Sequence, residues 1–419
     1  MKKILIVGGG AAGMACGVFL ADAGFEVELF EKNEKFGKKI YITGKGRCNF
    51  TNDCDFDTLM DSVKSNPKFL YSAFRGFMPQ DAIALFEDLG VRTKVERGNR
   101  AFPASDHASD IINALHRGMK KAGVHLHLNT AVASLLVEKE KVKGLVLEDG
   151  REILGDAVVV ATGGLSYPST GSTGDGYRFA KECGHTVTET MTSLVPLTVK
   201  EEYIIRMQGL SLKNVTLKLF KDKKKVYEGF GEMMFTHFGI TGPLVLTASA
   251  EVGKMLSNQN LRAVIDWKPA LNNKQLDERL LREFKGNENR IFRNGSAALL
   301  PQKAHSVFMD MMGDTAEKKI HDVTKKERNR FIDLLKNFPF TITGRRGYNE
   351  AVITKGGVKV GQIQPGSMES KLVDGLYFIG EVLDLDALTG GFNLQIAWST
   401  AHQAALALKE KYQEEGHEY

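Results

Sequence analysis

Residues 3–32 decide the fold, and they read K-I-L-I-V-G-G-G-A-A-G-M-A-C-G-V-F-L-A-D-A-G-F-E-V-E-L-F-E-K. Residues 4–7 form a short apolar run, which is typical of a strand buried on both faces of a sheet. Residues 11–23 have the composition of a helix, and Gly24 stands where a helix C-cap is expected. Residues 25–30 predict a second strand. The stretch therefore predicts a complete β-α-β unit, which is the beginning of an α/β fold.

Three glycines between the first strand and the helix match the pattern G-x-G-x-x-G. Gly8 permits a tight turn, Gly10 lets a pyrophosphate approach the backbone, and Gly13 allows close packing of the helix on the sheet. The free N–H groups at the helix start favour the anionic pyrophosphate. Glu31 ends the second strand and can accept hydrogen bonds from ribose hydroxyls, which favours FAD or NAD over NADP. The alternative is a glycine-rich turn in an ordinary α/β protein, and the surrounding strand, helix and acidic residue argue against it.

The composition describes a soluble globular protein of two or three domains. The chain has 419 residues, of which 42% are hydrophobic and 26% are charged. A net charge of +5 is small against 56 basic and 51 acidic side chains, so charge alone does not indicate a nucleic-acid partner. No stretch approaches the roughly 20 apolar residues of a membrane span.

The four cysteines, Cys16, Cys48, Cys54 and Cys183, have no C-x-x-C spacing and no accompanying histidine cluster. This pattern predicts reduced thiols, no metal site and a cytoplasmic location. The N-terminal apolar run is too short for a signal peptide. The oligomeric state is left open.

Two further stretches point to the same cofactor. Residues 32–52 hold Gly37, Gly44 and Gly46 among several cations, which favours a segment that wraps the cofactor over a solvated basic loop. Residues 157–161 predict another buried strand, and it runs into the sequence A-T-G-G, which ends at Gly164. In flavoproteins with two dinucleotide-binding domains, such a strand returns beside the first β-α-β unit.

The remaining chain predicts a discontinuous arrangement of domains. We expect residues 53–121 to be mostly helical. Short strands predicted at residues 194–199, 210–220 and 225–230 indicate an inserted antiparallel domain. Heptad-like apolar spacing over residues 270–337 indicates a helical part. The predicted domains are a cofactor-binding domain at 1–190 and 345–419, a β-barrel-like domain at 191–265 and 338–344, and a helical insertion at 266–337.

The C-terminal region is expected to complete the cofactor site. A predicted strand ends in Gly380-Glu381, and Asp386 and Gly390-Gly391 follow before a helix predicted at residues 394–409. Paired glycines before a helix N-terminus can hold a flavin or its ribityl chain. The alternative is a helix that only closes the sheet.

Several longer stretches resemble the BaiN-like or HI0933-like family of bacterial NAD(P)/FAD-dependent oxidoreductases. They are T-G-K-G-R-C-N-F-T-N at 43–52, F-T-H-F-G-I-T-G-P at 235–243 and G-E-V-L-D-L-D-A-L-T-G-G-F-N-L-Q-I-A-W at 380–398. The resemblance covers essentially the whole chain. It implies non-covalent FAD and an α/β fold, in which a Rossmann-like FAD-binding domain of the two-dinucleotide-binding-domain type carries an inserted antiparallel β-barrel-like domain and a small helical subdomain. Phe392 departs from the family pattern, where tyrosine is more common.

By position, the resemblance assigns the FAD contacts to Gly8, Gly10, Ala11, Ala12, Gly13, Glu31, Lys32, Lys38, Thr43, Gly44, Arg47, Cys48, Asn49, Val132, Ala161, Thr162, Gly163, Gly380, Glu381, Asp386, Gly391, Phe392 and Asn393.

The activity expected from the resemblance is an FAD-dependent oxidoreductase on a small organic substrate. We favour a reductase of an enone such as a 3-dehydro-bile acid. Because no second G-x-G-x-x-G follows a strand, NAD(P)H is expected to be a transient donor. The alternatives are an aminoacetone-type amine oxidase that uses oxygen, an RNA-acting flavoenzyme and a non-catalytic flavin-binding protein. Tyr167 and His237 are candidates for the substrate pocket, each with a purely structural alternative, and the catalytic proton donor is left open.

Overall fold

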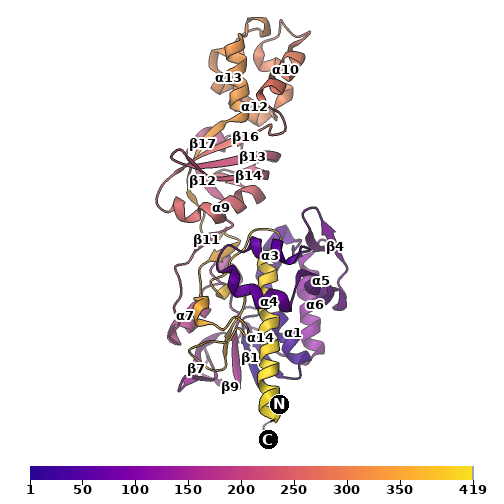
Figure 1. Cartoon of the computed structure of the whole chain (residues 1–419), viewed down its shortest axis with the longest axis vertical. Helices are drawn as coiled ribbons and strands as arrows, with labels where there is room; N and C mark the ends of the chain where they lie inside the picture. The colour runs from indigo at the N-terminus through magenta and orange to yellow at the C-terminus, as the bar shows by residue number, and fades with distance from the viewer. Residues whose placement is uncertain (418–419) are drawn as a thin grey trace. The chain divides into compact units, whose positions relative to one another are not determined.

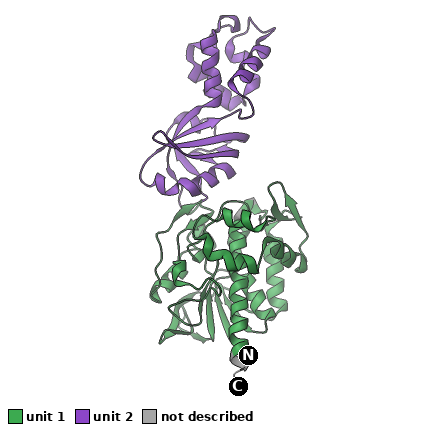
Figure 2. Ribbon diagram, in the orientation of Figure 1, with its two compact units in different colours: residues 1–193, 348–419 green, residues 194–347 purple. Residues whose placement is uncertain are grey.

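The chain folds into two compact units. The computed structural model describes residues 1–417, apart from the side chains of Thr43, Lys45 and residues 415–417. Unit 1 comprises residues 1–193 and 348–419, and unit 2 comprises residues 194–347 (Figure 2). Unit 1 is therefore built from both ends of the chain, with unit 2 inserted between them.

A five-stranded parallel sheet forms the centre of unit 1, in the order β19-β10-β1-β2-β6. β1 lies in the middle, paired with β10 on one side and with β2 on the other. Because the strands are parallel, their carboxyl ends meet at one edge, which is where such sheets bind ligands. The strand bounds are Lys3–Val7 (β1), Glu26–Phe30 (β2), His125–His127 (β6), Ala157–Val160 (β10) and Leu376–Phe378 (β19).

The helix α1, Ala11–Asp22, packs between α6, Ala108–Lys121, and the long final helix α14, Phe392–His417 (Figure 1). α1 is apolar around most of its circumference, as expected of a helix with neighbours on several sides. α14 begins two residues before its predicted start and extends eight residues beyond its predicted end. It places a segment from the end of the chain against the first helix.

The prediction that residues 53–121 are mostly helical is confirmed, but the region also contains two strands that were not predicted. Besides α3, α4, α5 and α6, this region contains the hairpin β4–β5, which pairs with β3. Its turn uses Gly98 and Asn99 with positive φ angles of +77° and +57°. The other elements of unit 1 are α2 (Lys38–Ile42), β3 (Thr51–Asn52), α3 (Phe56–Ser62), α4 (Tyr71–Gly76), α5 (Pro79–Asp88), β4 (Thr93–Glu96), β5 (Arg100–Pro103), β7 (Val132–Glu138), β8 (Lys141–Leu147), β9 (Glu152–Leu154), α7 (Asp175–Glu182), β11 (Met191–Ser193) and β18 (Ile353–Lys355).

Unit 2 contains a closed antiparallel barrel in the order β12-β15-β14-β13-β16-β17. With the parallel sheet of unit 1, this barrel confirms the predicted fold class. The predicted strand 194–199 is shorter in the structure, since Leu194 has a φ of +50° and β12 begins at Leu197. The bounds are Leu197–Val199 (β12), Ser211–Lys221 (β13), Lys224–Phe235 (β14), Gly239–Thr241 (β15), Leu261–Asp266 (β16) and Phe338–Arg345 (β17), with helices α8 (Glu202–Ile205) and α9 (Pro243–Leu256).

Helices α10 to α13 occupy the segment between β16 and β17. Asn272 and Thr324 begin α10 and α13 with reciprocal capping boxes, which satisfy the free N–H groups of each first turn. Trp267 and Phe308 pack edge to face, so the helices share a hydrophobic core with the barrel. Residues 266–337 lie within unit 2, and we propose that they form a helical subdomain of it. The bounds are Asn273–Phe284 (α10), Phe292–Gly295 (α11), Gln302–Met312 (α12) and Lys325–Lys336 (α13).

Among the described residues, no helix combines the length and the apolar character needed to cross a bilayer.

Candidate functional site

The glycine-rich turn is crowded on its inner side and open on its outer side. A Cβ atom on Gly13 would lie 1.9 Å from the carbonyl oxygen of Gly8, and one on Gly8 would lie 2.6 Å from that of Ala161. Gly8 also has a φ of +107°, which favours glycine. In contrast, a Cβ on Gly10, the N-cap of α1, would meet nothing within 4 Å. The backbone at Gly10 is therefore accessible to a ligand at the helix N-terminus.

The Glu31 carboxylate, which was predicted to bind ribose hydroxyls, accepts hydrogen bonds from the glycine turn and from Asn33. Its side chain is buried, and one carboxylate oxygen accepts the Gly9 N–H at 2.8 Å. The other accepts the backbone N–H of Asn33 at 2.8 Å and its side-chain amide at 2.6 Å. A carboxylate offers about four acceptor positions, so room for one ribose hydroxyl remains. Glu31 thus fixes the glycine turn to β2, a role that the sequence did not reveal.

We expect Glu31→Ala to weaken FAD binding about 10- to 100-fold, because a hydrogen bond to a charged group contributes roughly 1.5–3 kcal/mol. Titration of apoprotein with FAD measures this effect. Melting of the apoprotein separates loss of the ribose contact from loosening of the Gly9 turn, and Glu31→Gln is the control that keeps an acceptor oxygen. Equal FAD affinity in the alanine variant and the parent would remove the ribose assignment.

The cations predicted to contact FAD have carboxylate partners within unit 1. The Lys32 ammonium lies 2.6 Å from Asp175, and that of Lys38 lies 3.3 Å from Glu34. Arg47 forms ion pairs with two carboxylates and lies 4.2 Å above the Phe102 ring. Hydrogen bonds to Glu96 and then to Asp106 raise the Arg47 pKa. These cations are held in place by the protein itself.

The tight turn around Cys48 lies beside these cations. Gly44 and Cys48 both have a φ of +58°, and burial raises the pKa of the Cys48 thiol to about 12. Cys48 is therefore a neutral packing residue rather than a reactive thiolate. Thr43 begins the 3-10 helix Thr43–Gly46, and its side chain lies outside the described residues.

Three predicted contacts carry buried polar atoms without a hydrogen-bond partner among the described residues: Asn49 Oδ1, Thr162 Oγ1 and Asp386 Oδ1. A buried polar atom without a hydrogen bond destabilises the folded protein, so we expect a bound ligand to supply a hydrogen-bond partner for each of these atoms. The Lys355 ammonium lies 3.8 Å from Asp386 Oδ1, too far for a hydrogen bond. Burial raises the Asp386 pKa. These atoms and the open Gly10 backbone fit the polar groups of FAD.

Close contacts between glycines and distant segments bring the predicted site together. A Cβ on Gly380 would lie 2.8 Å from the Cβ of Ala12, and one on Gly391 would lie 2.4 Å from the Thr51 carbonyl group. The Ala161 N–H donates to the Val7 carbonyl at 2.8 Å. The ends of β1, β10 and β19, the start of α14 and the strand β3 therefore meet at the carboxyl edge of the sheet.

The other predicted contacts lie around this edge or support it. Thr130 N–H donates to the Glu31 carbonyl at 2.9 Å, which brings the start of β7 with the buried Val132 towards Glu31. The Asn393 side-chain amide is committed to its own loop, since its Oδ1 accepts the Ala387 N–H at 2.9 Å and its Nδ2 donates to the Ala387 carbonyl at 2.8 Å. The remaining predicted FAD contacts are the half-buried Ala11, Gly163 with a φ of +72°, and the buried Phe392.

A polar cluster that the sequence analysis missed joins three of these segments. The Lys39 ammonium lies 2.5 Å from Glu381 and 2.7 Å from the Ser166 hydroxyl. Ser166 Oγ and the Thr354 N–H each donate to Glu381 Oε1 at 2.9 Å. Lys39 and Glu381 are separated by 342 positions, so spacing could not pair them. The predicted contact Glu381 is thus a crosslink between the segments after β2, β10 and β19.

The two pocket candidates lie in different units. Tyr167, in unit 1, has a φ of +54°, and burial together with the charge of Glu350 raises its pKa. His237, in unit 2, is exposed, and its ring lies 4.9 Å from that of Phe238. Among the side chains that the structure describes, no group of three or more His, Cys, Asp or Glu residues is arranged to hold a metal ion.

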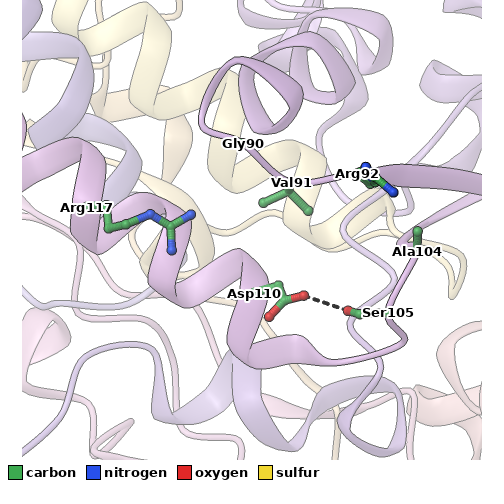
Figure 3. A pocket seen from close by; sticks show the side chains of 7 residues that line it. All are labelled: Gly90, Val91, Arg92, Ala104, Ser105, Asp110 and Arg117. Carbon is green, nitrogen blue, oxygen red and sulfur yellow. Dashed lines mark hydrogen bonds between the residues drawn. The ribbon is translucent and has the colours of Figure 1, made fainter.

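A surface hollow of about 530 Å³ in unit 1 lies apart from the predicted contacts (Figure 3). Ser105 and Asp110 on its wall are joined by a hydrogen bond of 2.6 Å. None of its lining residues belongs to the glycine turn or carries an unpartnered polar atom. The candidate site is therefore defined by the carboxyl edge of the sheet. The hollow is lined by Gly90, Val91, Arg92, Ala104, Ser105, Asp110 and Arg117.

Comparisons with known proteins identify the family and the fold. The model of the HI0933-like protein Rossmann domain matches residues 2–407. The chain is 29% identical to the 3-dehydro-bile acid delta(4,6)-reductase of Clostridium scindens, over 98% of this chain and 100% of that protein. It is 32% identical to the ribosomal RNA dihydrouridine synthase of Haemophilus influenzae, over 97% and 98% respectively. The solved 3-ketosteroid delta1-dehydrogenase of Sterolibacterium denitrificans matches with a TM-score of 0.56, 13% identity and coverage of 98% and 100%, a likeness of fold alone.

Proposed function

Because the chain belongs to the HI0933-like family and is an FAD-dependent oxidoreductase, we propose that it reduces a carbon–carbon double bond conjugated to a carbonyl group, with NAD(P)H as a transient electron donor. The observation that carries the proposal is the carboxyl edge of the sheet. The backbone at Gly10 is open, and Asn49, Thr162 and Asp386 of the neighbouring segments each carry a buried polar atom without a hydrogen-bond partner among the described residues. This arrangement suits a non-covalent flavin.

The names of two relatives describe the same kind of reaction. A 3-dehydro-bile acid delta(4,6)-reductase saturates double bonds conjugated to a ring ketone. A dihydrouridine synthase saturates the uracil double bond that is conjugated to a ring carbonyl. The substrates differ greatly in size and charge, so the shared chemistry supports the reaction class more strongly than either substrate.

In this proposal, bound FAD supplies the hydride chemistry, and the protein supplies position and proton control. The N–H groups at the start of α1 hold the pyrophosphate, and Glu31 orients the ribose. The Lys39–Glu381 ion pair holds together the segments that follow β2 and β19 beside the proposed cofactor site. The Tyr167 phenol is protonated at neutral pH, as phenols ordinarily are, and its raised pKa keeps it so; we propose it as the donor of the proton that adds to the α-carbon of the conjugated system.

A second candidate substrate is a uracil base within RNA, and the charge distribution favours it. Unit 2 has 27 Lys and Arg residues against 17 Asp and Glu residues, a net charge of +10. Unit 1 has 29 against 34, a net charge of −5. A small enone does not require such a division, whereas the RNA backbone attracts a basic domain. The modest total charge of +5 conceals this division, and the small-molecule substrate was favoured on the family resemblance alone.

An anaerobic experiment in two half-reactions tests the proposal. We expect NADH or NADPH to bleach the flavin, and a conjugated steroidal enone or a uridine-containing RNA to restore its colour. We expect Tyr167→Phe to leave bleaching unchanged and to slow the recovery about 100-fold, since positioned proton transfer contributes roughly 10²–10⁴-fold. A flavin that nicotinamides cannot bleach but aminoacetone can would replace the reductase with an amine oxidase. A flavin that no donor reduces would leave a non-catalytic flavin-binding protein.

A further inference from the structure

The longest hairpin of unit 2 ends in a cluster of exposed lysines. β13 and β14 are joined at the turn K-D-K-K-K, which spans residues 221–225. Lys221, Lys223 and Lys224 are all exposed, and no ion pair within the described residues joins any of them to a carboxylate. Their charges are therefore available to an outside partner.

The barrel register brings more cations to the same end. Phe220 pairs with Arg262 at the start of β16, and the exposed Arg262 guanidinium lies 4.4 Å above the Phe220 ring. α9 ends at Leu256, five residues before β16 begins, and carries the exposed Lys254 in its last turn. The basic rim, as we name it, consists of Lys221, Lys223, Lys224, Lys254 and Arg262.

The carboxylate of Glu228, beside the lysine turn, is neutralised by neighbouring lysines. Glu228 pairs with Lys225 and lies 3.7 Å from the Lys218 ammonium, and hydrogen bonding to Lys225 lowers its pKa. The remaining acid of the turn, Asp222, has a φ of +53° and shapes the hairpin. The rim therefore keeps an excess of positive charge.

An exposed aromatic ring lies on the same outward face of the hairpin. Phe230 pairs with Thr216, four residue pairs along the ribbon from the Phe220 pair, and is 59% exposed. A large ring left this exposed on the outward face of a hairpin whose turn carries a run of cations suits the stacking of an unpaired base.

We propose that the basic rim and Phe230 together bind single-stranded RNA, the lysines at the phosphates and Phe230 at a base. This proposal rests on the RNA form of the proposed function. The net charge of +10 on unit 2 complements a polyanion. A barrel that combines cations with an exposed aromatic ring is an established way to bind single strands. The rim positions the RNA, and reduction remains the task of unit 1.

The test measures binding of fluorescein-labelled 20-nucleotide oligouridylate to the full-length, FAD-loaded protein across a range of salt concentrations. The parent is expected to show a linear fall of log affinity with log salt. The triple variant K221A/K223A/K224A is expected to lose about 100-fold in affinity at 0.1 M salt and to lower the slope by about 2, since each single-strand phosphate contact contributes about 0.7. Phe230→Ala is expected to lose about 5- to 100-fold with an unchanged slope.

Matched controls come from unit 1. The triple variant K139A/K143A/K181A removes three exposed lysines, and Leu154→Ala removes a side chain that is 64% exposed. Both should bind the oligonucleotide like the parent, and all variants should keep their FAD and its bleaching by NAD(P)H. A parent that shows no salt-dependent affinity would overturn the RNA form of the function together with this surface. A parent that binds, with rim variants that bind equally well, would overturn this surface alone.

Discussion

Gly10→Val is expected to deprive the protein of FAD while leaving the apoprotein folded. A side chain at position 10 meets no protein atom within 4 Å, and the Gly10 φ of −83° suits any residue. It would instead occupy the space through which a pyrophosphate reaches the first N–H groups of α1. Losing two hydrogen bonds to a charged group costs about 3–6 kcal/mol, so FAD affinity should fall by more than about 100-fold.

Two measurements on purified apoprotein separate the effects, namely FAD titration and the thermal midpoint. Gly366→Val is the matched control, because a side chain there also meets nothing within 4 Å and position 366 is outside the predicted site. Unchanged FAD affinity in Gly10→Val would show that the cofactor does not approach α1 in this way. A lowered thermal midpoint would instead show that position 10 is not open.

Gly13→Ala is expected to damage the fold itself. The new methyl group would lie 1.9 Å from the Gly8 carbonyl oxygen, and neither the helix nor β1 can move without disturbing the sheet. Overpacking of this severity should lower the free energy of unfolding by about 3 kcal/mol or more. At roughly 2–4 °C per kcal/mol for a domain of this size, the thermal midpoint should fall by about 6–12 °C.

Gly17→Ala in the same helix provides the comparison. Its methyl group would approach the flexible Met119 side chain at 3.2 Å, and alanine favours a helix over glycine by about 1 kcal/mol. This variant should melt near the parent or slightly above it. If Gly13→Ala melts with the parent, the tight contact between helix and strand does not support the turn.

Local sequence patterns predicted the elements whose partners are nearby in the chain. The β-α-β unit that begins at Lys3 follows from a buried apolar run, three glycines and a helix, all within thirty residues. The hairpin β4–β5 was missed because its strands are short and half-exposed, and apolar spacing in the flanking helices dominates the region. Exposed short strands depend on their partners more than on their own composition.

Long-range pairings lay beyond the sequence patterns. β16 pairs with β17, whose residues lie about 75 positions later, and nothing local marks either as the strand that closes the barrel. The candidate site shows the same contrast between features that local sequence patterns predict and contacts that form only between distant segments. Glycine patterns predicted the turn at Gly8 and Gly13, whereas the ion pair of Lys39 with Glu381 exists only once the chain ends have met. A single total charge likewise could not reveal two units of opposite sign.

The strand β19 and the helix α14 belong to the last part of the chain, yet β19 pairs with β10 and α14 packs on α1. During synthesis from the N-terminus, the first β-α-β unit and the whole of unit 2 leave the ribosome before either element exists. The carboxyl edge therefore has no Gly380, Asp386 or Gly391 until residues 380–391 have been synthesised. A nascent chain that carries only the glycine turn lacks these residues, so we expect stable binding of the cofactor to follow their synthesis.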